Sequence, residues 1–208
     1  MTWDAVWKYA LCCIAAYLLG SVSSGILISR SRGHNIRAEG SKNTGASNVL
    51  RSVGVVEGLL TFVCDFAKAA AAVWIGRALL GQWGAMAAGI FVVIGHNWPL
   101  FFEFRGGKGI ACSVAVLLFT YTWQGAAAIG LCLLLILITR YISLGSLSLL
   151  TAFAVLVALT EGIWPAGAWA ILLALLGYWR HRGNIRRILD GTEHRLTFKK
   201  KTPPTPQR

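Results

Sequence analysis

Seven long apolar stretches run through this chain and limit what it can fold into. They cover residues 5–29, 55–76, 84–102, 107–123, 125–141, 143–160 and 163–179. An α-helix rises about 1.5 Å per residue, so roughly 20 apolar residues cross a hydrocarbon core of about 30 Å. A soluble chain of 208 residues that is 56% hydrophobic could not hide its apolar surface from water. The pattern therefore predicts an all-α membrane protein, a polytopic bundle of about seven transmembrane helices.

The distribution of charge separates seven spans from six. The fourth and fifth stretches are short, and they could instead form one long helix bent near Gln124 and Gly125. With seven spans, every Lys and Arg except Lys8, Lys68 and Arg77 falls on one side of the membrane, whereas six spans remove this bias. Because basic residues gather in cytoplasmic loops, we expect seven spans, an N-terminus outside and a C-terminus in the cytoplasm.

Composition narrows the chemistry further. The four histidines and five cysteines are scattered without metal-ligand spacing, so we expect no metal and no cofactor. A net charge of +12 would suggest nucleic acid in a soluble protein, but these basic residues lie between apolar spans. We therefore expect no nucleic-acid partner. The anions that these basic residues bind should be lipid head groups or small phosphorylated molecules.

The chain should form one domain and a tail. Residues 1–193 should form a single membrane-embedded domain, and 194–208 a basic, disordered cytoplasmic tail.

The connection over 40–51, GSKNTGASNVLR, combines glycines with hydrogen-bond donors and cations. Gly40 and Gly45 let the backbone turn its N–H groups toward an anion, as in phosphate-binding nests. A predicted helix follows, and its N-terminus would strengthen such a site. The alternative is a solvated turn that carries cytoplasmic positive charge. The remaining donors and cations of the segment are Ser41, Lys42, Asn43, Ser47, Asn48 and Arg51.

A second connection places Lys108 among Gly106, Gly107 and Gly109 at the start of a predicted helix. Backbone N–H groups, the helix dipole and one ammonium would together cradle a phosphate. The segment is not a Walker A loop, because Lys108 is followed by glycine and not by Ser or Thr. His96 lies at the end of the preceding span, where it is either a packed, hydrogen-bonded residue or part of the site.

The third basic segment, 180–193, reads RHRGNIRRILDGTE. Attraction to anionic lipid, worth about 1 kcal/mol per basic residue, is the simple explanation for its charge. Lipid attraction does not require His181 and Asn184, whose spacing of three residues places both on one helical face. We therefore expect these two side chains to contribute to a site.

Asp65 and Lys68 form an i, i+3 pair inside the second apolar stretch. Charges within a membrane span are costly unless they are paired or functional. We interpret the two residues as a structural pair that fixes a helix near the site.

Several common catalytic motifs are absent from the sequence. No histidine is followed by aspartate five residues later, and there is no Gly-x-Ser-x-Gly elbow and no His-Glu-x-x-His helix. A site in this chain must therefore use phosphate-binding loops without a recognisable His–Asp base.

Three segments resemble, in this order, the motifs of the acyl-phosphate:glycerol-3-phosphate acyltransferases, the PlsY family of bacterial membranes. They are the connection over 40–51, the glycine-rich connection around Lys108 and the basic segment 180–193. The resemblance extends to about Glu193 and departs from the common family pattern at Thr44, where proline is usual, and at Ser47, where threonine is usual. It implies an enzyme that moves a fatty acyl group from acyl phosphate to the 1-hydroxyl of sn-glycerol 3-phosphate. The products would be 1-acylglycerol 3-phosphate (lysophosphatidate) and phosphate, in the first acylation of phospholipid synthesis.

The resemblance also implies roles for individual residues. Lys108 and Arg51 would neutralise phosphate, while Ser41 and Asn184 would orient the hydroxyls of glycerol 3-phosphate. The acyl chain would lie between helices, open to the bilayer. The implied catalytic residues are Ser41, Arg51, Lys108, His181 and Asn184. The implied substrate- and phosphate-binding residues are Gly40, Asn43, Gly45, Ser47, Asn48, His96, Gly106, Gly107, Gly109 and Arg182, with Ser47, Asn48, Gly106 and Gly107 at the acyl-phosphate head.

The expected partners are glycerol 3-phosphate, acyl phosphate and the lipid bilayer, with a functional link to the enzyme that makes acyl phosphate. The expected location is the bacterial inner membrane, with the active site at its cytoplasmic face. The alternative function is a membrane carrier for a phosphorylated solute, because broken helices with anion sites are typical of transporters. Against a carrier, the sequence shows no obvious internal repeat and its basic motifs all gather on one face.

Overall fold

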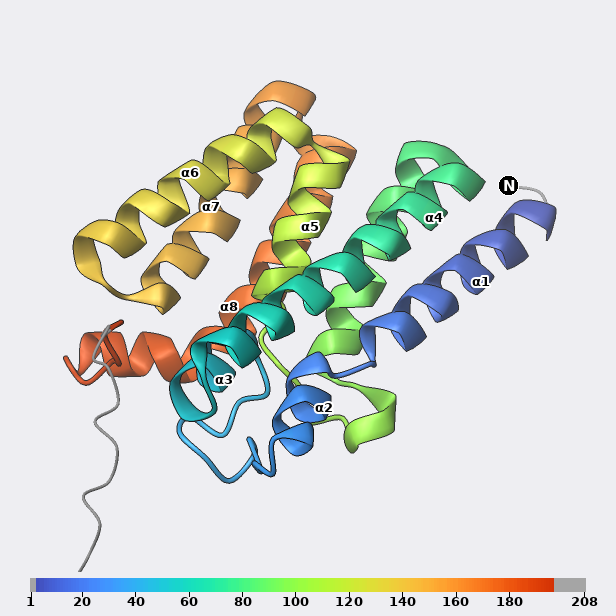
Figure 1. Ribbon diagram of the computed structural model, residues 1–208. Helices are drawn as coiled ribbons and strands as arrows, with labels where there is room; N and C mark the ends of the chain where they lie inside the picture. Colours follow the sequence, from blue (N-terminus) through green and yellow to red (C-terminus); the bar gives the residue numbers. More distant parts are fainter. Residues whose placement is uncertain (1–2, 197–208) are drawn as a thin grey trace, which may run out of the picture.

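The computed structural model describes residues 3–196 as an all-helical bundle (Figure 1). The elements are α1 (Trp3–Gly20), α2 (Ser24–Ser31), α3 (Ala46–Ser52), α4 (Val55–Asn97), the short 3-10 helix η1 (Leu100–Phe102), α5 (Ile110–Thr120), α6 (Thr122–Thr139), α7 (Ile142–Glu161), the π-helical turn η2 (Ile163–Gly167) and α8 (Ala168–Leu189). Each of the seven predicted apolar stretches is mostly helical, so the predicted fold class is confirmed. By length and apolar composition alone, four helical segments can cross a membrane: Trp3–Ser31, Val55–Phe102, Thr122–Thr139 and Ile142–Glu161.

The element α4 holds two predicted spans as one helical hairpin. Its backbone leaves helical geometry at Leu80 and at Gly81, where φ is +63°. The chain reverses there. The close approach of the two halves shows this, since a Cβ atom added at Gly76 would lie only 2.4 Å from the carbonyl oxygen of Gly84. Eight residues of straight helix would separate these positions by about 12 Å. The two predicted spans are therefore antiparallel neighbours joined by a very tight turn.

The predicted first span, 5–29, is not continuous. It breaks after Gly20, and α2 begins only at Ser24. The Lys68 ammonium donates hydrogen bonds to the carbonyl oxygens of Gly20, at 2.9 Å, and Val22, at 2.6 Å. A cation from another helix thus takes the place of the helical N–H donors, which compensates for the break.

The fourth and fifth stretches form two separate helices, not one bent helix. They meet at Tyr121, whose φ of −133° and ψ of 85° end α5 before α6 begins. The junction therefore lies a few residues before the predicted position near Gln124. The buried Gln124 amide instead donates to Thr160 and to the Glu161 carboxylate, at 3.0 and 2.9 Å, and ties α6 to the end of α7.

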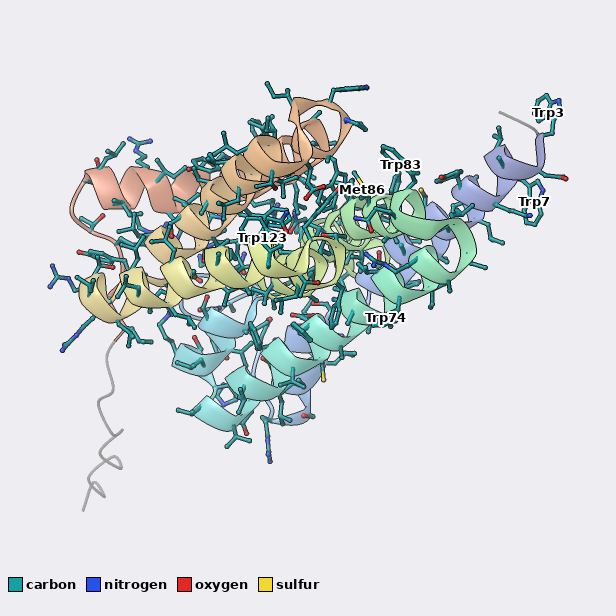
Figure 2. The ribbon with its side chains drawn as sticks, turned by 90° about the horizontal axis from the view of Figure 1, so that it is seen from above. Trp3, Trp7, Trp74, Trp83, Met86 and Trp123 are labelled. Atoms are coloured by element: carbon teal, nitrogen blue, oxygen red, sulfur yellow. The ribbon has the colours of Figure 1, made fainter. Side chains whose placement is uncertain are left out.

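The core lies between α1, α4, α5, α6, α7 and α8, where Tyr121, Phe153 and Trp169 pack with ring centroids 6.1–6.4 Å apart. The outer surface is also apolar, as expected for helices that face lipid. Trp3 is 87% exposed and Leu137 is 77% exposed. Figure 2 shows Trp3 and Trp7 projecting from the N-terminal end of α1.

The last helix carries the bundle into the third basic segment. Its α-helical part begins at Ala168, later than the predicted start at 163, and continues without a break to Leu189. The chain then returns toward the loop between α6 and α7, where the Leu196 N–H donates to the carbonyl oxygen of Arg140 at 2.7 Å. The rest of the predicted tail, from 197, lies outside the described residues. In Figure 1, α2, α3 and the red end of α8 gather at one end of the bundle, away from the N-terminus.

Candidate active site

A cavity of about 250 Å³ opens at the end of the bundle where the three motifs meet. Its lining combines polar and apolar side chains. The polar side chains are Asn43, Ser47, Arg51, His96, Lys108, His181, Asn184, Arg187 and Glu193, among others. The apolar side chains, from α4, α5, α6 and α7, include Phe62, Val114, Ile129, Cys132, Leu133, Ile136 and Leu149. The fold thus brings cationic and hydrophobic side chains together around one cavity.

Asn48 organises the first motif instead of facing the cavity. Its side chain is fully buried, and its amide donates to the carbonyl oxygens of Glu39, at 3.1 Å, and Asn43, at 2.9 Å. Its Oδ1 accepts the Ser41 N–H at 2.9 Å. The Asn48 amide, which we expected to bind an anion, is thus already engaged within the loop. Asn48 therefore shapes the loop from within and does not line the cavity, contrary to the expected contact with the acyl-phosphate head.

Arg51 is the cation that the first motif brings to the cavity. It lies in the last turn of α3, and among the residues that the structure describes it forms no ion pair. Asn43, Gly45 and Ser47 line the cavity beside it, whereas Gly40 and Ser41 do not. Ser41 is half-buried and follows the turn at Gly40.

The glycines of the second motif pack against the end of α4. The N–H groups of Gly106 and Gly107 donate to the carbonyl oxygens of Asn97, at 3.3 Å, and His96, at 3.1 Å. A Cβ atom at Gly107 would lie 2.0 Å from the His96 Nε2 atom, so only glycine fits there. These two N–H groups are consequently unavailable for the predicted phosphate cradle, and neither glycine lines the cavity. The glycines permit close packing, and the anion-binding capacity of the loop lies further along.

Lys108 is the residue of the second motif that enters the cavity. Its Nζ donates to Asn184 Oδ1 at 2.5 Å. Gly109 follows with φ +82°, lines the cavity and leads directly into α5, whose first turn has free N–H groups. Burial lowers the pKa of Lys108 to about 8; Glu193 opposes this effect, and Arg187, Arg51 and Arg180 add to it.

His181 and Asn184 of the third motif lie on one face of α8, both buried and both lining the cavity, as their spacing predicted. The His181 Nδ1 atom is 2.8 Å from the carbonyl oxygen of Gly177. Because a carbonyl only accepts, Nδ1 carries the proton and Nε2 remains an acceptor. Burial, followed by the charge of Lys108, lowers the pKa of His181 to about 4, so the ring is neutral at physiological pH. Arg182 points elsewhere: it is exposed and stacks on the Trp179 ring at 5.1 Å.

Arg187 and Glu193 also line the cavity, although neither was assigned to the site from the sequence. Glu193 accepts hydrogen bonds from Ser143, at 2.9 Å, and Asn184, at 2.6 Å, and pairs with Arg187 at 2.8 Å. Although burial alone would raise it, these hydrogen bonds hold the pKa of Glu193 below its ordinary value. The signal in the sequence was an acidic residue within a strongly basic segment. It was insufficient because the contact with Ser143 joins positions 50 residues apart.

Beneath the glycine-rich loop lies the predicted Asp65–Lys68 pair, with a separation of 2.8 Å. His96 joins it, with Nδ1 3.5 Å from Asp65 and 3.2 Å from Lys68 Nζ. Asp65, His96 and Cys112 bring potential metal ligands within 4.8 Å of one another. The Lys68 ammonium already supplies positive charge to this cluster. The cluster is therefore better suited to hold α4 against the break after Gly20 than to bind a metal ion.

The chain is similar to known proteins along nearly its whole length. A profile of the glycerol-3-phosphate acyltransferase family matches residues 10–191. A glycerol-3-phosphate acyltransferase of Thermoanaerobacter sp. strain X514 is 42% identical over 187 residues, which cover 89% of this chain and 94% of the relative. A glycerol-3-phosphate acyltransferase of Thermus thermophilus is 41% identical over 194 residues, with 92% and 95% covered.

Solved structures agree as well. The crystal structure of PlsY, an integral membrane glycerol 3-phosphate acyltransferase, in its glycerol 3-phosphate form superimposes with a TM-score of 0.85 at 34% identity, covering 91% of this chain and 96% of that one. The lysophosphatidic acid form gives a TM-score of 0.82 at 32% identity, with 91% and 95% covered. A match over nearly the whole chain in both sequence and structure settles the relationship. The chain belongs to the glycerol-3-phosphate acyltransferase family, integral membrane acyltransferases of phospholipid synthesis.

Proposed function

We propose that this acyltransferase takes its acyl group from acyl phosphate and transfers it to the 1-hydroxyl of sn-glycerol 3-phosphate, at the cytoplasmic face of a bacterial inner membrane. The products are 1-acylglycerol 3-phosphate and inorganic phosphate. The observation that carries the proposal is one cavity lined by both cationic and apolar side chains. Among similar proteins, PlsY has been crystallised in glycerol 3-phosphate and lysophosphatidic acid forms, which are a substrate and a product of this reaction.

The charge of the pocket suits two phosphate groups. Each substrate brings about −1.5 to −2 charge at neutral pH. Lys108 and Arg51 offer positive charge in the cavity, whereas Arg187 and the carboxylate of Glu193 pair with each other. We assign the phosphate of glycerol 3-phosphate to Lys108 and Arg51. The acyl-phosphate head then lies beside Ser47 and the free N–H groups at the start of α5.

The apolar side chains of the cavity suit a fatty acyl chain. Leu133 of α6 is one of them and is 55% exposed. We infer that this part of the cavity opens sideways to the bilayer. An acyl chain can therefore enter sideways while its phosphate stays in the cationic pocket.

The reaction needs orientation and charge neutralisation more than a strong protein base. The 1-hydroxyl oxygen attacks the carbonyl carbon, the bond from that carbon to the phosphate oxygen breaks, and the hydroxyl proton passes to the departing phosphate. Cations fixed before the reaction stabilise the phosphate as its negative charge grows. Neutral His181, with Nε2 as an acceptor, can orient a hydroxyl of glycerol 3-phosphate. Asn184 fixes the Lys108 ammonium through its Oδ1 atom.

The identity of the donor decides this proposal. Purified protein with glycerol 3-phosphate should release phosphate with acyl phosphate and give no product with acyl-CoA or acyl-carrier protein as competing donors. EDTA should not reduce the rate. Turnover with acyl-CoA alone, or its loss in EDTA, would contradict the proposed chemistry. We expect another enzyme to supply the acyl phosphate.

A further inference from the structure

The side chain of Arg180 lies behind the glycine-rich loop and binds its carbonyl groups. Its Nε donates to the carbonyl oxygen of Gly107 at 2.9 Å, and its Nη2 donates to the same oxygen at 2.6 Å and to that of Gly106 at 3.0 Å. The guanidinium lies 5.1 Å from the centre of the Trp98 ring. A planar, five-donor group stacked on an indole is therefore fixed in position and in orientation.

The same two residues are held from the opposite direction by α4. Their N–H groups donate to the carbonyl oxygens of Asn97 and His96, while their carbonyl groups accept from Arg180. The carbonyl group of Gly107 belongs to the peptide bond that leads into Lys108. The peptide bond between Gly106 and Gly107 is held at both its ends, and the next peptide bond is held at its carbonyl group. These contacts fix the backbone from which the Lys108 side chain reaches the cavity.

Arg180 does not line the cavity itself. We infer that Arg180 is a positioning residue, which holds the glycine-rich loop so that the Lys108 ammonium faces the phosphate of glycerol 3-phosphate. The inference rests on the proposed role of Lys108 and extends it to a residue that makes no substrate contact. It also connects the second and third motifs, which otherwise meet through Lys108 and Asn184.

The charge of Arg180 has a second consequence at Lys108. Its guanidinium contributes to the lowered pKa of Lys108, together with burial and other cations. Removing this charge should move the deprotonation of Lys108 to higher pH, while a lysine at the same position should leave it in place. The other titratable or charged groups around Lys108 are Arg51 of α3, Asp65 and His96 of α4, His181 and Arg187 of α8, and Glu193 and His194 after α8.

Two substitutions separate geometry from charge. Arg180→Lys keeps the charge but cannot reproduce the two-carbonyl contact, so the KM for glycerol 3-phosphate should rise by on the order of tenfold, with an unchanged alkaline limb of kcat/KM. Arg180→Gln should raise the KM at least as much and move the alkaline limb to higher pH. The KM for the acyl donor should stay unchanged in both.

Arg186 provides the matched control on the same helix, because its side chain is 86% exposed and contacts only Asp190, at 3.9 Å, among the described residues. Arg186→Lys and Arg186→Gln should behave like the parent enzyme. If Arg180→Gln has the KM and alkaline limb of Arg186→Gln, or loses only thermal stability, the inference is wrong. If that variant does not fold, the KM of Arg180→Lys decides. These assays can use any acyl donor that supports turnover. A wrong assignment of the acyl donor would therefore not be mistaken for failure of the inference about Arg180.

Discussion

Replacing Lys108 by alanine tests the assignment of the phosphate pocket most directly. The ammonium is half-buried, and Asn184 Oδ1, at 2.5 Å, is its one hydrogen-bond partner among the described residues. A phosphate oxygen about 2.8 Å from Nζ would interact with it by about 6 kcal/mol per unit charge at an effective dielectric constant of about 20. Arg51 and Arg187 remain in the variant and recover part of this energy. We therefore expect a net loss of about 3–4 kcal/mol, or roughly 100- to 1000-fold in kcat/KM.

The assay is phosphate release by purified enzyme at varied glycerol 3-phosphate. Thermal unfolding of each variant in detergent shows whether the bundle is intact. Lys108→Arg should recover only part of the activity, because a planar guanidinium does not fit a position that a compact ammonium fills. Lys8→Ala is the control, since Lys8 is exposed on α1 beside the Trp7 ring.

Equal and mild effects of Lys108→Ala and Lys8→Ala would refute the reasoning. The glycine-rich loop would then be a charged turn, and the phosphate would have to be held by Arg51 and Arg187. A large effect that Lys108→Arg restores in full would show that charge alone matters at this position. In that case the short contact with Asn184 would carry no positional information.

Three further results are expected. The kcat/KM for glycerol 3-phosphate should fall as pH rises through about 8, because Lys108 loses its proton there; a flat profile to about pH 10 would contradict this. Asn48→Ala should lower the free energy of unfolding by about 1–3 kcal/mol, because buried loop groups lose their partners, whereas Ser47→Ala should change it little; equal melting temperatures would count against the structural role of Asn48. Single cysteines at Lys42 and Arg186, in a background without the five native cysteines, should react with an impermeant reagent from the same side of the membrane, and labelling from opposite sides would overturn the expected topology.

Apolar length and charge bias were enough to predict the bundle, because the bilayer imposes the same requirement on every span. They could not show how helices break. The interruption after Gly20 depends on Lys68, which is 48 residues away in the sequence and replaces the missing backbone donors. Likewise, the junction at Tyr121 is a local backbone event inside a region that is apolar on both sides. Hydrophobicity does not distinguish a continuous helix from two helices in contact.

The candidate site shows a similar division. The side chains Arg51, Lys108, His181 and Asn184 were expected at the site, and all four line one cavity. The resemblance of the three motifs to the family singled out these four side chains, together with Ser41, which does not line the cavity. The hydrogen-bond partners of the loops were not predictable. Asn48 was expected to bind an anion but satisfies its own loop, since a buried amide takes the nearest carbonyl groups.

The glycine-rich loop illustrates what such a loop contributes when its N–H groups are already engaged. Gly106 and Gly107 let the backbone approach His96 and Asn97 closely, and Arg180 binds the carbonyl groups of the same two residues. The N–H groups of Gly106 and Gly107 are therefore not free to bind a phosphate, and the loop instead fixes the position of the Lys108 ammonium. Because the lysine side chain is long and flexible, the position of its ammonium depends on how firmly the backbone that carries it is held. Sensitivity to substitution should consequently extend behind the cavity, to residues such as Arg180 that hold this peptide without touching the substrate.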